Sequence, residues 1–160
     1  RIGYLPENGP LYEEMTPLSL LNFFADARSM ASARKSERID QVIQQCALQT
    51  VLSKPIGKLS RGFRQRVGMA NVLLHEPEVL IMDEPTAGLD PNQVLEVRKT
   101  IKGLGKTILL STHILQEVPQ VADRVILINQ GRLLFDGTPD DLKEESSLDS
   151  WFNNQTMTAA

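Results

Sequence analysis

Apolar residues recur at helical spacing through most of the first half of the chain. Thr16 followed by Pro17 is a typical helix start, with a capping hydroxyl and a proline in the first turn. Residues 1–5 are strand-like, and a polar loop containing proline and glycine follows them. The expected helices run from Thr16 to about residue 25, from about 36 to 47, and from Ser60 to about 75.

The second half of the chain alternates strand and helix patterns. Val79–Met82 is a continuous apolar run, typical of a strand covered on both faces, and Thr107–Ser111 is another. A helical pattern over residues 92–104 separates these two runs. The remaining expected elements are a short helix at 114–121, strands at 124–128 and 132–136 around a turn at 129–131, and a short helix from 139 to 144.

These patterns predict an α/β fold with a parallel sheet core and a helical subdomain inserted before most of that core. We expect the helical subdomain at about residues 14–75, the α/β core at 76–138, and a C-terminal helix and tail at 139–160.

Composition narrows the class of protein only slightly. The 160 residues fit one domain or most of one, and the net charge of −3 gives no general attraction to nucleic acid or anionic lipid. The single cysteine, Cys46, has no partner for an internal disulfide and is expected in the core. Because the chain begins at Arg1, already within a strand pattern, we expect it to be a piece of a longer domain.

Two carboxylates directly follow the first buried strand. A strand–helix–strand unit is parallel and right-handed, so Asp83 and Glu84 are expected at the same sheet edge as His113, which follows the next strand. Asp83 suits Mg²⁺, which usually keeps part of its water shell. Glu84 is placed to orient or deprotonate a water, and His113 to donate a hydrogen bond to a terminal phosphate.

A possible anion site opens the third helix. Ser60 supplies a hydroxyl, Gly62 allows close approach to the backbone, and a helix N-terminus favours negative charge. No phosphate cradle is visible in the sequence. The stretch Gly103–Thr107 superficially resembles one, but it follows a helix and opens a strand, so it predicts a helix end and a turn.

Taken together and in order, these segments resemble the nucleotide-binding domain of ABC-type ATPases. Leu-Ser-Arg-Gly-Phe at 59–63 resembles the signature segment, usually Leu-Ser-Gly-Gly-Gln. The other matching segments are Walker B with its glutamate at 79–84, the D-loop at 87–90, the switch histidine at His113, and the Q-loop at 4–7 with Glu7 in place of glutamine. The resemblance covers residues 1–138, and its wording is most similar to the bacterial exporter type.

The resemblance implies a P-loop NTPase-like core, present in part, and a chemistry that uses ATP and Mg²⁺. It assigns catalysis to Glu84 and His113, and Mg²⁺ to Asp83 with Glu7. The implied nucleotide contacts are Ser60, Arg61, Gly62 and Asp90. Because Arg61 stands where the family has glycine, Ser60 and Gly62 are the firmer phosphate contacts.

The resemblance also implies partners. It predicts a peripheral protein on the cytoplasmic face of a bacterial membrane, bound to a transmembrane permease and to a second nucleotide-binding domain in a homodimer, without nucleic acid. The intact protein is expected to hydrolyse ATP. The present chain, which has no Walker A segment, is expected to be inactive alone and to expose apolar surface that favours self-association.

Two alternatives stay open. One is a non-transport ABC ATPase acting on DNA or ribosomes, which the acidic composition disfavours. The other is a non-enzymatic truncated regulator that uses the Walker A segment of a partner.

Overall fold

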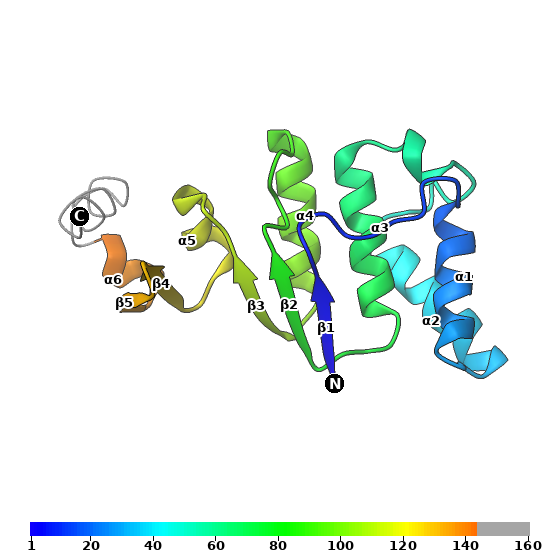
Figure 1. The fold of residues 1–160 in the computed structure, drawn as a ribbon, viewed down its shortest axis with the longest axis horizontal. Coiled ribbons are helices and arrows are strands. Elements are labelled where there is room, and N and C mark those ends of the chain that lie inside the picture. The colour runs from blue at the N-terminus through cyan, green and yellow to red at the C-terminus, as the bar shows by residue number, and fades with distance from the viewer. Residues whose placement is uncertain (144–160) are drawn as a thin grey trace. The chain divides into compact units, whose positions relative to one another are not determined.

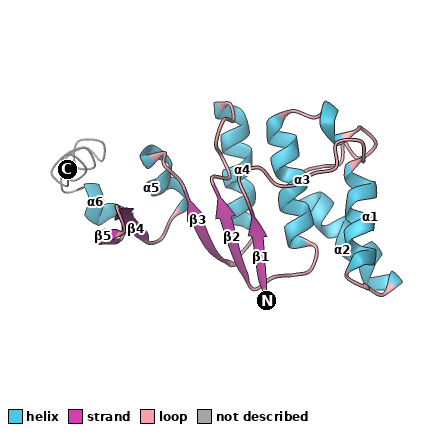
Figure 2. Cartoon of the chain, in the orientation of Figure 1, coloured by secondary structure: helices cyan, strands magenta, loops and turns pink. Residues whose placement is uncertain are grey.

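A computed structural model describes residues 1–143 and divides the chain into two compact units. The first unit is Arg1–Ser111, and the second begins at Thr112. The first unit combines a parallel sheet with helices, which confirms the predicted α/β class (Figures 1 and 2). The predicted tail falls outside the described residues from residue 144 onward.

The sheet of the first unit has three parallel strands in the order β1-β2-β3 (Figure 1). They are β1 (Ile2–Leu5), β2 (Val79–Asp83) and β3 (Thr107–Ser111). Leu5 pairs with Met82 in one ladder, and Asp83 with Ser111 in the other. The carboxyl ends of β2 and β3 therefore lie side by side, as the parallel strand–helix–strand unit predicts.

Three helices form the helical part of the first unit and pack against one another. They are α1 (Pro17–Ala27), α2 (Ser32–Gln45) and α3 (Arg61–Leu73), with a single 3₁₀ turn, η1, at Ile56–Lys58 before α3. Thr16 caps α1 through a reciprocal pair of bonds with Ser19. The second helix begins four residues earlier than its apolar spacing predicts, because its first turn is polar and carries no periodic signal.

One face of the sheet is covered by α3 and by α4 (Pro91–Gly103). A Cβ on Gly3 would stand 2.6 Å from a methyl of Val72, so α3 lies directly on β1. Leu80 and Met82 of β2 join this core, together with Val97 and Ile101 of α4. Cys46 is also buried in the core, and loss of hydration raises the pKa of its thiol to about 12.

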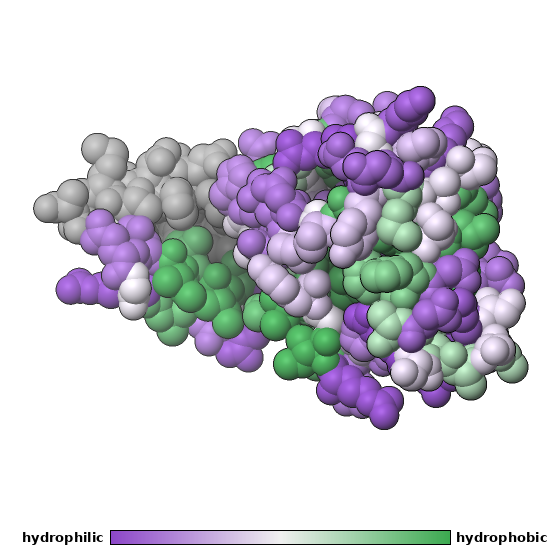
Figure 3. Space-filling model, turned by 45° about the vertical axis from the view of Figure 1, so that its right-hand side comes forward, coloured by the Kyte–Doolittle hydropathy of each residue, from purple (hydrophilic) through white to green (hydrophobic). Residues whose placement is uncertain are grey.

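The other face of the sheet is open within the described residues. Ile2, Tyr4 and Leu109 are 63%, 55% and 60% exposed, and the alternate residues of β2 are only half-buried. Within residues 1–143, β2 is therefore covered on one face and not on both as expected, because α3 and α4 reach only one side. Apolar side chains come to the surface among polar ones (Figure 3), as expected from the sequence, while self-association stays a prediction.

The second unit contains an antiparallel hairpin. Strands β4 (Val125–Asn129) and β5 (Arg132–Gly137) pair across a turn in which Gln130 and Gly131 both have positive φ. Arg124 donates two hydrogen bonds to Asp136, and this pairing holds the pKa of the carboxyl below its usual value. The unit's other elements are the 3₁₀ turn η2 (Leu115–Glu117), α5 (Val118–Val121) and α6 (Pro139–Lys143).

No helix within residues 1–143 is long and apolar enough to cross a bilayer.

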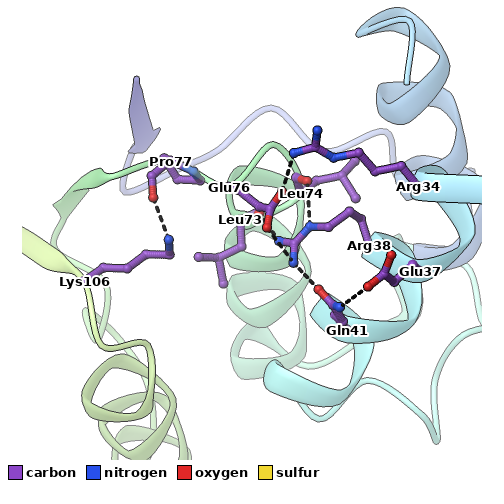
Figure 4. A network of polar contacts seen from close by, with 9 residues as sticks. All are labelled: Arg34, Glu37, Arg38, Gln41, Leu73, Leu74, Glu76, Pro77 and Lys106. Atoms are coloured by element: carbon purple, nitrogen blue, oxygen red, sulfur yellow. Dashed lines mark hydrogen bonds and ion pairs between the residues drawn. The ribbon is translucent and has the colours of Figure 1, made fainter. Parts of the chain in front are cut away.

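Hydrogen bonds from Arg38 and from Lys106 hold the connection between α3 and β2 from two sides, an arrangement called the clamp below (Figure 4). The buried guanidinium of Arg38 on α2 donates to the carbonyl oxygens of Leu73 at 2.9 Å and Leu74 at 3.3 Å, at the end of α3. Lys106, just before β3, donates to the carbonyl of Pro77 at 2.7 Å. Glu76 lies between them, and the hydrogen bond from Arg34 lowers the pKa of its carboxyl.

Replacing Arg38 tests the energetic part of this clamp. We expect Arg38→Met to lower the free energy of unfolding by about 2 kcal/mol, since it removes charge-assisted bonds to buried helix-end carbonyls. Arg34→Met is the matched control, because its side chain is 60% exposed where that of Arg38 is 10% exposed, and should cost well under 1 kcal/mol. Urea unfolding measures both, and equal losses would contradict the clamp.

Candidate functional site

The carboxylate of Asp83 is oriented by the neighbouring strand. Ser111 ends β3 opposite Asp83, and its hydroxyl donates to Asp83 Oδ1 at 2.6 Å. The amide of Glu84 in turn donates toward the carbonyl and the hydroxyl of Ser111, both at 3.2 Å. Ser111 is a residue that sequence reasoning missed, and the available signal was the parallel register that places it beside the acid.

The chain turns sharply as soon as β2 ends. Glu84 has a φ of 45°, a conformation that non-glycine residues adopt rarely and at a cost of about 1–3 kcal/mol. Two tight turns follow, in which Ala87 N donates to Glu84 O at 3.1 Å and Leu89 N to Thr86 O at 3.2 Å. Backbone strain of this kind concentrates at functional sites.

Asp90 has a structural task in the D-loop. Its Oδ1 accepts hydrogen bonds from the amides of Asn92 and Gln93, both at 3.0 Å, and so caps the N-terminus of α4. The nucleotide contact implied for Asp90 stays a prediction beside this role.

The signature segment forms the start of α3 as predicted. Ser60 is the N-cap, and its hydroxyl accepts from the amide of Phe63 at 3.3 Å. The side chain of Gln93 on α4 lies directly against Gly62, since a Cβ there would stand 2.8 Å from Cδ of Gln93. The signature segment and the start of α4 are thus in direct contact, which sequence spacing did not indicate.

Glu7 and Arg61 lie together. Nη2 of Arg61 is 3.8 Å from Oε1 of Glu7, and both side chains are about half exposed. The sequence assigned Glu7 to a metal and Arg61 to a nucleotide. Both assignments stay predictions, and in the structure each residue also has the other as a partner of opposite charge.

His113 follows β3 by two residues and belongs to the second compact unit. Its predicted approach to Asp83 and Glu84 stays a prediction.

The residues at the end of β2 fit a magnesium–nucleotide complex better than an ion held by protein alone. Within residues 1–143, no three histidine, cysteine or acidic side chains gather to hold a metal. Mg²⁺ in nucleotide sites commonly takes one or two carboxylates and completes its shell with phosphates and water. Asp83, oriented by Ser111, would supply such a carboxylate, while the metal role expected for Glu7 stays a prediction.

Comparison with known proteins identifies the family. The ABC transporter family profile matches residues 1–87. The chain is 40% identical over 150 residues to the bacitracin transport ATP-binding protein BcrA of Bacillus licheniformis, covering 91% of this chain and 48% of the relative. It is 37% identical to the daunorubicin resistance ATP-binding protein DrrA3 of Streptomyces coeruleorubidus, covering 93% and 48%.

Solved structures agree with this assignment. CbiO1 from Clostridium perfringens, part of the ABC transporter complex CbiONQ, superimposes with a TM-score of 0.83 at 31% identity, covering 99% of this chain and 65% of that one. The chain therefore belongs to the ABC transporter family and has the fold of its ATP-binding domains. It spans about half the length of BcrA and DrrA3.

Asp90 allows capping to be separated from any contact with nucleotide. Asp90→Ala should lower the free energy of unfolding by about 1 kcal/mol, because two amides of α4 lose their acceptor. Asp90→Ser, which keeps a capping oxygen without the charge, should restore most of that loss in a urea titration. Equal stability of the alanine variant and the parent would show that the cap contributes nothing.

Proposed function

We propose that the protein is the ATP-hydrolysing subunit of an ABC transporter and couples ATP binding and hydrolysis to export through a membrane permease. Relatives named for bacitracin transport and daunorubicin resistance support the export direction. The observation that carries the proposal is the constrained pair of acids at the end of a parallel strand, with Asp83 oriented by Ser111.

The two acids have different tasks in this proposal. Asp83, fixed by Ser111, would hold Mg²⁺, with Glu7 as the other carboxylate. Mg²⁺-bound ATP, when present, supplies the phosphoryl group that is transferred to water. Glu84, which stands in a positive-φ turn directly after Asp83, orients that water and accepts its proton. His113 donates to a terminal phosphate oxygen, where charge builds up during transfer.

The signature segment acts on a second nucleotide-binding domain. Ser60 and Gly62 lie at the N-terminus of the 13-residue helix α3, which favours an anion. We infer that this end of α3 faces the phosphates bound by the partner domain in a homodimer, with Asp90 at the same contact. In this arrangement the signature segment contacts the nucleotide of the partner domain, while the Walker A segment of that partner binds the same nucleotide from the other side.

The permease is expected to bind near the loop after β1. Tyr12 in that loop and Phe23 on α1 are both about half exposed, and their rings meet edge to face with centroids 6.0 Å apart. The loop is held by hydrogen bonds of 2.9 Å from Ile56 to Met15 and from Gly57 to Glu13. A rigid, partly aromatic surface of this kind suits a peripheral subunit at the cytoplasmic face of a membrane.

The catalytic assignment is tested on the full-length protein that contains this chain. Glu84→Gln should lower the ATPase rate by about 100-fold or more and leave Mg²⁺-ATP binding intact, because the amide orients water but accepts no proton. Glu78→Gln, a change at an exposed carboxylate just before β2, should leave both quantities unchanged. Steady-state hydrolysis and equilibrium ATP binding give the two readouts, and a fully active Glu84→Gln protein would overturn the proposal.

The 160 residues alone should not bind ATP tightly. Backbone amides and a lysine normally neutralise most of the charge on a triphosphate, and the sequence contains no such cradle. A titration with fluorescent ATP should therefore show no micromolar, Mg²⁺-dependent binding to the isolated chain. Micromolar binding would refute this part of the proposal.

A further inference from the structure

The side chain of Arg61 lies against the backbone of the D-loop. A Cβ built on Gly88 would stand 2.6 Å from Cζ and 3.3 Å from Nε of Arg61, so the guanidinium lies directly over this glycine. Gly88 has a φ of +66°, which glycine adopts without strain. The first residue of α3 is thereby in contact with a loop 27 residues further along the chain.

The same guanidinium reaches the loop after β1. Its Nη2 atom is 3.8 Å from Oε1 of Glu7, while other atoms of the group face Gly88. One side chain therefore joins three segments: the turn at Glu7, the signature segment and the D-loop.

The two charged residues stand where the family pattern has uncharged ones. Glu7 replaces glutamine and Arg61 replaces glycine. A glycine at position 61 would have no side chain to cover Gly88. It would also leave the negative charge of Glu7 without the guanidinium that faces it. Together the two departures compensate in charge and meet in space.

We infer that Arg61 is a positioning residue that fixes the signature segment to the D-loop and to Glu7 of its own subunit. Its guanidinium is directed at its own chain, so phosphate contact in this segment falls to Ser60 and Gly62. A half-exposed ion pair contributes little to global stability. We therefore expect its effect to be local, on how often the D-loop opens. Only the consequence for hydrolysis rests on the proposed function.

Charge reversal in the full-length protein tests the pair. Glu7→Arg and Arg61→Glu each place like charges together, so amide hydrogen exchange of residues 86–90 should become about two- to fivefold faster in each. The double reversal restores opposite charges and should return exchange to within about twofold of the parent. Lys58→Gln, which removes an exposed cation next to the signature segment, is the matched control and should not change exchange.

The outcomes are distinct. Rescue by the double reversal supports the inference, and a double variant at least as fast as the faster single one overturns it. If the parent shows no ATPase activity, the proposed function fails while the exchange experiment still tests the pair. Where the parent is active, kcat should fall in Arg61→Glu, with KM for ATP changed less than kcat. Variants of Glu7 also lose a carboxylate proposed for Mg²⁺, so the exchange rates alone decide the rescue.

A second cycle tests the contact with Gly88 independently of charge. Gly88→Ala should accelerate exchange of the D-loop more in the parent than in an Arg61→Gly background, because only the parent has a guanidinium for the new methyl group to displace. Equal effects in the two backgrounds would overturn the contact.

Discussion

The parallel pairing of β2 with β3 is the constraint on which the site depends. Parallel register places Ser111 beside Asp83, and the 2.6 Å hydrogen bond between them fixes one carboxylate at the sheet edge. The following residue, Glu84, has a positive φ, and its amide donates to Ser111 as well, so one residue of β3 contacts both acidic residues. Helices α3 and α4 pack on one face of this sheet and support the paired strands.

Close contacts at glycines organise the segments around this edge. Gly62 lets α3 approach Gln93 of α4, and Gly88 lets the guanidinium of Arg61 lie on the D-loop. The signature segment thus contacts both the D-loop and the start of α4 within one compact unit, although these segments are far apart in the sequence. A small displacement of the signature segment should therefore also move the D-loop and the start of α4, because closely packed groups cannot deform independently.

Arginine has two physical uses in this unit. Arg38 is buried and donates to helix-end carbonyls, so its loss leaves polar groups without a partner and affects global stability. Arg61 is half exposed and water competes for its charge, so its effect is confined to the loops it touches. The difference in burial, rather than the residue type, separates a stabilising arginine from a positioning one.

The sequence alone was sufficient for the α/β class, the parallel β2–β3 unit, the caps Thr16 and Ser60, and the placement of Asp83 at a strand end, because these depend on local periodicity and adjacent residues. It also led to the family that the comparisons identified. Only the tertiary structure decided that Ser111 orients Asp83, that β2 is covered on one face in the described chain, and that Glu7 meets Arg61. Each of these depends on contacts between residues distant in sequence, and no local spacing encodes which distant groups come within hydrogen-bonding range.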